Sequence, residues 1–278
     1  MRGIRSSLSG IGGHFGMAYP PVWNPGLLTD PNCVAWYRFE NDFPTDAHVD
    51  DCKGGNDLHL IGSPDRDSNH FKGKYSVHFD RNSDEYIYEH DIDLDVGFPW
   101  RFNDGAGVIK NGSFCCWFLM HEAAPNPWYY YFLMGKGAGL RLSVLKAGIG
   151  VGIGKPLNPD GDRTWYPRLT LHIASGVAAE NFTLDSLLIN VATWYHVAVT
   201  YEDATRAYRL RAREKGGSPQ EIVGNAANNV AILMALYFNC AGPADDDHFS
   251  GLIDEAVVFN DVLTASEIDK ISEGSYRY

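Results

Sequence analysis

Two short clusters of aromatic residues in this 278-residue chain each follow a turn, where they could bind a sugar. One cluster follows a proline-containing loop and the other an Asn-Pro-Asp-Gly turn. Carbohydrate sites are shallow grooves in which aromatic rings stack on the apolar faces of pyranose rings. The alternative is that these are ordinary core and rim aromatics, because alternate residues of a strand face inward. The glycan-binding candidates are Trp128, Tyr129, Tyr130, Trp165 and Tyr166.

Oxygen-bearing side chains form a candidate calcium site in a short glycine-containing loop, where Asp51, Asn56 and Asp57 lie close in sequence. Hard cations require several oxygens that converge on one point, and Glu40 is a further donor. The alternative is a solvated turn in which these oxygens bond to the backbone. The run Asp245 to His248 could bind a cation too, although three successive acids are more often a solvated loop.

Composition limits the classes of function. The chain has 23 Lys and Arg against 35 Asp and Glu, a net charge of −12, which argues against a nucleic-acid or anionic-membrane partner. Its 45% apolar and 21% charged residues predict a folded domain with a substantial core. The longest apolar run, Val230 to Phe238, is too short to insert into a bilayer. Five cysteines, an odd number, argue against a complete disulfide framework.

The chain divides into two parts by composition. Residues 1–32 are rich in Gly, Ser and Pro and show no hydrophobic periodicity. We interpret them as an N-terminal arm that docks on a neighbouring subunit; the alternatives are an arm held by its own domain and a loose tail. No cleaved signal peptide is expected, because Gly and Ser interrupt the apolar run that should follow the early arginines. Residues 33–278 form the second part, a single domain.

Short apolar runs separated by turn residues predict an all-β domain, built as a two-sheet sandwich or a barrel. One segment predicts a helix: Thr264 to Glu267 is a capping box that opens a short C-terminal helix ending near Ile271. The predicted strands are Val34 to Phe39, Tyr75 to Phe79, Glu85 to Tyr88, Ser113 to Met120, Tyr129 to Met134, Leu140 to Leu145, Leu169 to Ile173, Trp194 to Tyr201, Ala207 to Ala212, Ile232 to Phe238 and Leu252 to Phe259.

Alternation assigns faces to two of these segments. In Trp194 to Tyr201 the tyrosines and valines share one face, which should enter the core, and His196 on the other face should be a packed strand residue. In Gly148 to Gly154, Ile149, Val151 and Ile153 face one way. The other face of that strand is bare backbone, which allows a chain or ligand to approach closely.

Several segments, in order, resemble the laminin G-like jelly roll of the concanavalin A-like lectin/glucanase superfamily. The most similar are Thr193 to Tyr201 and Phe249 to Phe259, the second followed by Leu263 to Ile268. One departure is Tyr208 to Ala212, which lacks the usual Asn-Gly hairpin turn. The remaining segments are Trp36 to Glu40, Asp51 to Asp57, Phe71 to Gly73 with Val77 to Asp80 and Glu85 to Ile87, and Ser113 to Phe118.

The resemblance implies a two-sheet antiparallel jelly-roll sandwich and one structural Ca²⁺, with Asp254 closing the site formed by the Asp51 loop. It also invites a test for glycoside hydrolysis, because hydrolases of this superfamily carry alternating carboxylates on one strand. Retaining hydrolysis needs two carboxylates about 5 Å apart. The segment Glu89 to Asp93 is a near miss, because Asp93 stands where Glu is expected. We therefore expect no catalysis.

The sequence as a whole predicts a non-catalytic binding or structural module. The first hypothesis is a subunit of a surface assembly or virion, a decoration or tail protein, that docks through residues 1–32 and presents the sandwich. The second is a lectin-like module that binds carbohydrate on its own. The third is a glycoside hydrolase, which requires a cleft into which Glu89 and either Asp91 or Asp93 point.

Overall fold

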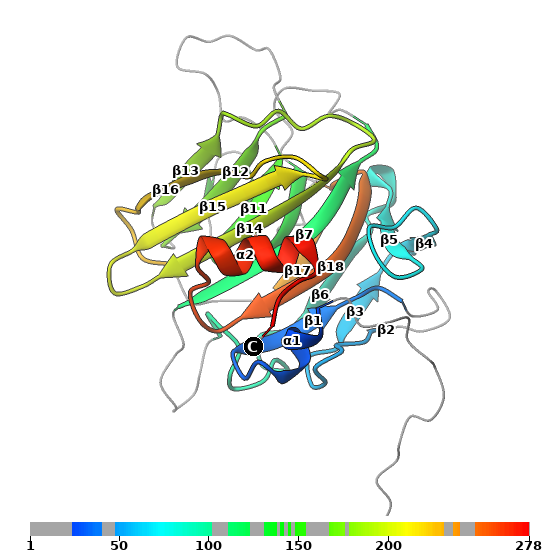
Figure 1. The fold of residues 1–278 in the computed structure, drawn as a ribbon, viewed down its shortest axis with the longest axis horizontal. Coiled ribbons are helices and arrows are strands. Elements are labelled where there is room, and N and C mark those ends of the chain that lie inside the picture. Colours follow the sequence, from blue (N-terminus) through cyan, green and yellow to red (C-terminus); the bar gives the residue numbers. More distant parts are fainter. Residues whose placement is uncertain are drawn as a thin grey trace, which may run out of the picture.

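Two antiparallel β-sheets packed face to face make up the body of the computed structural model (Figure 1). This confirms the predicted all-β sandwich. The described residues are 24–40, 48–101, 111–122, 131–137, 140–141, 144–145, 148–153, 167–175, 178–230, 236–239 and 248–277. Within these residues, no helix is long and apolar enough to cross a membrane.

Sheet A runs in the order β16-β15-β14-β7-β18-β5-β4, and β1 pairs with β18 beside this path. Its strands are β1 (Cys33–Tyr37), β4 (Asp65–Asp67), β5 (Ser76–Phe79), β7 (Gly112–Met120), β14 (Trp194–Glu202), β15 (Ala207–Glu214), β16 (Gln220–Asn225) and β18 (Gly251–Phe259).

Sheet B runs in the order β13-β12-β11-β8-β17-β6-β3-β2. Its strands are β2 (His48–Val49), β3 (Leu58–Ile61), β6 (Tyr86–Glu89), β8 (Tyr131–Gly137), β11 (Gly148–Ile153), β12 (Leu169–Ala174), β13 (Ala179–Leu184) and β17 (Leu236–Phe238). A separate hairpin pairs β9 (Leu140–Arg141) with β10 (Val144–Leu145), so the single strand predicted there is wrong.

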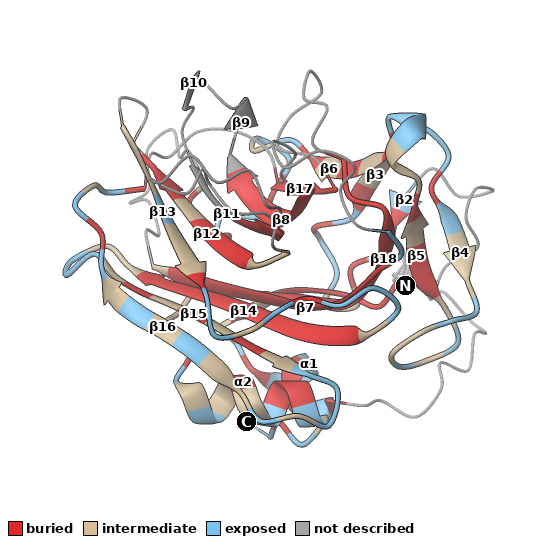
Figure 2. Ribbon diagram, turned by 90° about the horizontal axis from the view of Figure 1, so that it is seen from above, coloured by how far each residue is buried: buried red, intermediate tan, exposed pale blue. Residues whose placement is uncertain are grey.

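The main core lies between the two sheets, and Figure 2 shows the buried residues along β14 and β7 facing those of β12 and β8. The alternation predicted for β14 is confirmed, because Tyr195, Val197, Val199 and Tyr201 all belong to this core. His196 is packed on the opposite face, where burial lowers its pKa to about 3. In β11, Val151 and Ile153 enter the core as predicted.

The outer face of sheet A is also buried, because α2 (Ala265–Glu273) lies across it (Figure 1). The predicted capping box is present: the Thr264 hydroxyl accepts from the Glu267 backbone N–H, and the Glu267 carboxylate accepts from the Thr264 N–H. Ile268 and Ile271 pack against Trp36 and neighbouring residues of the sheet. A sheet with both faces covered explains why β7, β14 and β18 are almost continuously buried.

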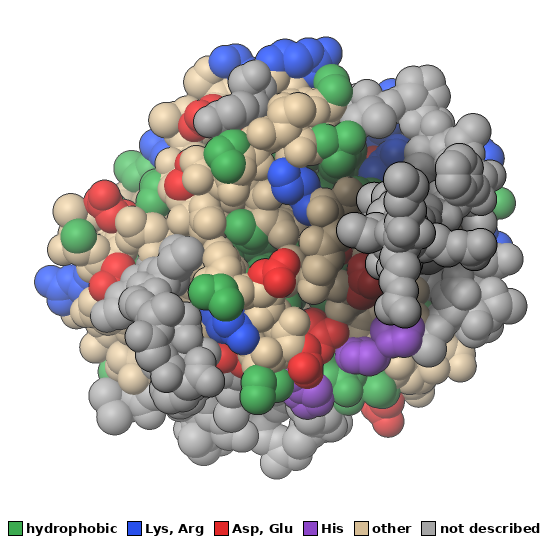
Figure 3. Space-filling view, turned by 90° about the horizontal axis from the view of Figure 1, so that it is seen from below, with side chains coloured by type: hydrophobic (Ala, Val, Ile, Leu, Met, Phe, Trp, Pro, Cys, Tyr) green, Lys and Arg blue, Asp and Glu red, His purple; other side chains and the backbone are tan. Residues whose placement is uncertain are grey.

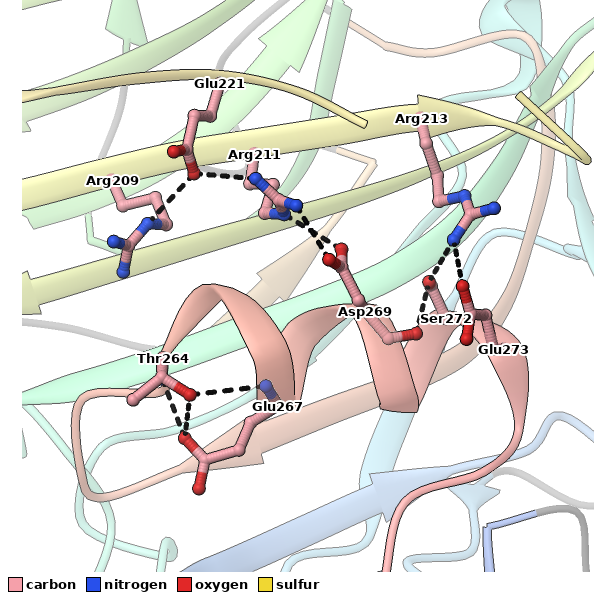
Figure 4. A network of polar contacts seen from close by, with 9 residues as sticks. All are labelled: Arg209, Arg211, Arg213, Glu221, Thr264, Glu267, Asp269, Ser272 and Glu273. Carbon is pink, nitrogen blue, oxygen red and sulfur yellow. Dashed lines mark hydrogen bonds and ion pairs between the residues drawn. The ribbon is translucent and has the colours of Figure 1, made fainter. Parts of the chain in front are cut away.

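Two arginines on β15, Arg211 and Arg213, fasten α2 to sheet A (Figure 4). Arg211 makes a bidentate ion pair with Asp269, with N–O distances of 2.9 and 2.7 Å, and it also contacts Glu221. Arg213 donates to Glu273 at 2.7 Å. The arginines alternate with core residues along β15. One face of the strand therefore packs in the core, and the other face contacts the helix.

Replacing Asp269 by Asn should lower the free energy of unfolding by about 1 kcal/mol, because a partly exposed bidentate pair is lost. The loss should shrink in high salt, which screens partly exposed charges. Urea unfolding at low and high ionic strength measures both effects, with Glu214→Gln on the exposed end of β15 as control. A loss that does not depend on salt would contradict the electrostatic explanation.

Residues 24–32, at the end of the segment interpreted as an arm, pack on the body. They form a second helix, α1 (Pro25–Thr29), which the sequence analysis missed. The Asn24 amide donates to the Ile271 carbonyl, and Asp30 accepts from the Tyr276 hydroxyl. Residues 1–23 lie outside the described residues, so docking on a neighbouring subunit stays a prediction.

Candidate functional site

The glycan candidates derived from the sequence, Trp128, Tyr129, Tyr130, Trp165 and Tyr166, lie outside the described residues. Binding at those loops therefore stays a prediction. The next residue, Tyr131, is buried in the core at the start of β8 and accepts a hydrogen bond from Arg81. It is thus one of the inward-facing aromatics that the alternative interpretation anticipated.

A continuous line of rings crosses the outward face of sheet B instead. His48, His59, Tyr88 and Tyr237 stand on four neighbouring strands, β2, β3, β6 and β17, and each is directly opposite the next in the strand register. We call these four residues the aromatic row. Residues directly opposite in antiparallel strands share a face of the sheet, so the four side chains project together.

The rings of the aromatic row are in contact along its length. His48 and His59 have ring centroids 4.6 Å apart, His59 and Tyr88 5.8 Å, and Tyr88 and Tyr237 6.1 Å. The two tyrosine rings are nearly parallel, with an interplanar angle of 24°. Beyond Tyr237 the same register position is occupied by Gly135, so the row ends there.

The row faces away from the core because its strand neighbours face into it. Val49, Leu58, Ile87 and Phe238 are fully buried between the sheets. His48 is exposed, and His59 and Tyr88 are partly exposed. Tyr237 is the most covered member, with 9% of its surface accessible.

Two further rings widen the row. Tyr86 precedes Tyr88 by two residues on β6, and their ring centroids are 5.8 Å apart. His90 stands edge-on to Tyr88 at 4.9 Å and is exposed. The result is an aromatic surface on one edge of sheet B that is broad enough to contact more than one ring of a ligand.

A buried carboxylate lies at the edge of this surface. Glu89 Oε2 is 3.6 Å from His59 Nε2, and Glu89 Oε1 accepts the His90 backbone N–H at 2.7 Å. Burial raises the pKa of Glu89, while His59 lowers it and Asp93 raises it further. The Glu89 carboxyl group thus adds a hydrogen-bond acceptor next to the His59 ring.

The loop after β6 is held by its own ion pair. Asp91 pairs with the buried Lys136 of β8, and burial lowers the pKa of that lysine. Arg101 donates to the carbonyls of Asp91 and Ile92 at 2.9 and 3.0 Å. These contacts fix the loop that carries His90.

The alternating carboxylates tested for hydrolysis do not share a strand. Glu89 is the last residue of β6, whereas Asp91 and Asp93 lie in the turn that follows. Glu89 faces His59, Asp91 faces Lys136, and Asp93 is exposed. This arrangement differs from two carboxylates facing each other across a scissile bond.

The predicted calcium residues of the first loop come together but bond to one another and to the backbone. Asp51 Oδ1 accepts from the N–H groups of Trp36 and Lys53 at 2.8 and 2.9 Å, and Asp57 Oδ1 accepts the Asp51 N–H at 2.8 Å. Asn56 donates to Val34 O at 3.0 Å. These bonds close the loop in the manner of the alternative interpretation.

Asp254 belongs to a different network. Its Oδ2 accepts the N–H groups of Phe71 and Lys72, each at 2.9 Å, and Glu40 accepts from Lys74 nearby in the same loop. Among the described residues, no three acidic, histidine or cysteine side chains are grouped so as to hold a metal ion. The donors thus do not fit a preformed site, and calcium binding stays a prediction.

The second acidic candidate lies mostly outside the described residues. Of Asp245 to His248 only His248 is described, and it is buried with Nε2 3.7 Å from the carboxylate of Asp84.

The alternation Tyr86-Ile87-Tyr88-Glu89 was the available sequence signal for the aromatic row, because it places two tyrosines on one face. Tyr237, His48 and His59 carry no such local signal. They join the row only through the pairing of strands that are distant in the sequence.

A comparison with protein families now identifies the sandwich. The profile described as "Concanavalin A-like lectin/glucanases superfamily" matches residues 109–269, more than half of the chain. The chain belongs to this superfamily. No curated protein sequence matches this chain significantly.

Solved structures with the same fold support this assignment. Domain 4 of AbnA, a GH43 extracellular arabinanase from Geobacillus stearothermophilus solved with arabinotriose, aligns with a TM-score of 0.57 at 13% identity, over 87% of this chain and 98% of that domain. The binding domain of Paraclostridial Mosquitocidal Protein 1 aligns with a TM-score of 0.57 at 12% identity, over 88% of this chain and 52% of the other.

A third similar structure is the binding domain of Botulinum neurotoxin DC in complex with rat synaptotagmin II. It aligns with a TM-score of 0.55 at 10% identity, over 88% of this chain and 52% of that one. At sequence identities this low, what this chain shares with the three proteins is the fold.

Proposed function

We propose that this protein is a non-catalytic carbohydrate-binding module whose ligand lies on the aromatic row of sheet B. The observation that carries the proposal is the row itself: four rings in contact on adjacent strands, facing outward, with a carboxylate at their edge. Sugar sites combine such ring surfaces with a small number of polar groups. The arabinotriose complex of a domain with the same fold adds support.

The carboxylate arrangement favours binding over hydrolysis. A retaining enzyme needs a second carboxylate about 5 Å from the first across the ligand. Here Asp91, the acid that follows Glu89 most closely in the sequence, forms an ion pair with Lys136. Glu89 is therefore assigned to hydrogen bonding of the ligand.

Replacing Tyr88 by Ala should weaken binding at least tenfold, because a central ring of a ligand surface contributes more than about 1.4 kcal/mol. Calorimetric titration with neutral arabino-, xylo-, cello- and manno-oligosaccharides measures the affinity of the wild type and the variant. Tyr75→Ala is the matched control, since Tyr75 stacks on Arg66 beside sheet A. The proposal fails if no oligosaccharide binds the wild type, or if Tyr88→Ala binds as tightly.

A further inference from the structure

We infer that the aromatic row accepts uncharged oligosaccharides of more than one ring and discriminates against anionic ones. This inference concerns the ligand class and rests on the proposed function. Its two parts, ligand length and ligand charge, come from separate observations.

The length follows from the strand register. The four members of the row stand on four adjacent strands. Neighbouring strands are about 4.8 Å apart, so the row extends about 14 Å across the sheet. The register places Gly135 after Tyr237, and β2 is the last strand of the sheet on the other side. A single sugar ring fills only part of this distance, so the ligand is a chain that runs across the strands.

The charge selection follows from Glu89. Glu89 is buried, with 4% of its surface accessible, and its carboxylate lies 3.6 Å from the ring of His59 in the aromatic row. Asp93, exposed in the next turn, acts on the same carboxylate. Figure 3 shows histidine and acidic side chains close to one another on the face of the molecule seen from below. A partly buried charge is screened less than an exposed one, so it repels an anionic ligand strongly.

Among the described residues, the lysine and arginine that hold the loop after β6 bond to groups other than Glu89. Lys136 is buried against Asp91, and Arg101 donates to two backbone carbonyls of the same loop. A sugar hydroxyl can donate to Glu89, whereas a sugar carboxylate cannot. The site should therefore bind a ligand with a hydroxyl group at this position more tightly than a ligand with a carboxylate there.

The test compares matched ligands on the wild-type protein. The probes are the mono- and trisaccharides of the neutral panel, together with each trisaccharide carrying a carboxymethyl ether or a hydroxyethyl ether of similar size. We expect the neutral trisaccharide to bind at least about tenfold more tightly than its monosaccharide. We expect the carboxymethyl form to bind at least about tenfold more weakly than the hydroxyethyl form.

Two variants test which residues cause the preference for uncharged over anionic ligands. Glu89→Gln should reduce the preference for the hydroxyethyl over the carboxymethyl form at least about tenfold, because it removes the charge and keeps the shape. Asp93→Asn, at an exposed position, should reduce it by a smaller factor. Glu214→Gln on sheet A is the control, with the preference unchanged.

The outcomes separate the inference from the function beneath it. If neutral trisaccharides bind but the carboxymethyl form binds equally well, or monosaccharides bind as tightly, the inference is overturned and carbohydrate binding stands. If neither neutral nor charged probes bind the wild type, the proposed function itself fails.

Discussion

Replacing Arg38 by Met should cost about 3–5 kcal/mol of unfolding free energy, because it leaves a buried carboxylate without its cation. Arg38 Nε lies 3.2 Å from Glu255 Oε1, with side-chain exposures of 3% and 2%. The Trp36 indole N–H donates to the other Glu255 oxygen at 2.7 Å. Together these contacts join β1 to β18, which β1 flanks in sheet A.

The loss should depend on pH. Burial raises the pKa of Glu255 to about 7 even with Arg38 beside it, so the ionised form depends on the arginine. At about pH 5 the carboxyl of the variant can protonate, whereas at about pH 8 it must be buried as an unpaired charge or force the site open. Urea unfolding at both values should therefore show a larger loss at the higher pH.

The double variant Arg38→Met/Glu255→Leu is the control for this prediction. Replacing both partners by apolar side chains removes the unpaired charge, so the double variant should be more stable than Arg38→Met alone. Equal stability of the single and double variants would show that packing of the arginine, not its charge, is what matters.

Replacing Gly251 by Ala should destabilise the sandwich by at least about 3 kcal/mol. A Cβ atom there would lie 2.1 Å from the backbone oxygen of Leu119 and 2.5 Å from the Phe249 ring. Overpacking typically costs about 1–3 kcal/mol, and a strand carbonyl yields less than a side chain. Scanning calorimetry should show a decrease in Tm of roughly 6–12 °C for a domain of this size.

Gly97→Ala is the matched control, because a Cβ atom at Gly97 would meet ordinary contacts of 3.8 and 3.9 Å. Its Tm should stay close to that of the wild type. A Tm of Gly251→Ala equal to that of Gly97→Ala would show that β7 and β18 can separate without cost at this position.

Local features of the fold were predictable from the sequence. The capping box of α2 and the two faces of β14 follow from residues within one turn or one strand. The polar edge strands β4 (Asp65–Asp67) and β16 (Gln220–Asn225) were missed, because half-exposed strands carry little hydrophobic signal. The helix α1 was missed because its five residues are too few to show periodicity.

The candidate site was much less predictable. Sequence reasoning searched for rings at loop edges, whereas the aromatic row is made by register between distant segments. Likewise, the acid Asp254 looked like a metal ligand, but its oxygens are used by backbone N–H groups of residues 71 and 72. In both cases the tertiary partner decides the role of the side chain, and a single sequence does not show that partner.

The most direct test of carbohydrate binding on sheet B is an NMR titration of the aromatic side chains with the tightest-binding neutral trisaccharide. Signals are assigned through single substitutions of the rings. The largest shift changes should occur at Tyr88, Tyr237 and His59. If those signals stay unchanged while Trp128 and Trp165 shift, the ligand binds at the loops and the aromatic row is not the site.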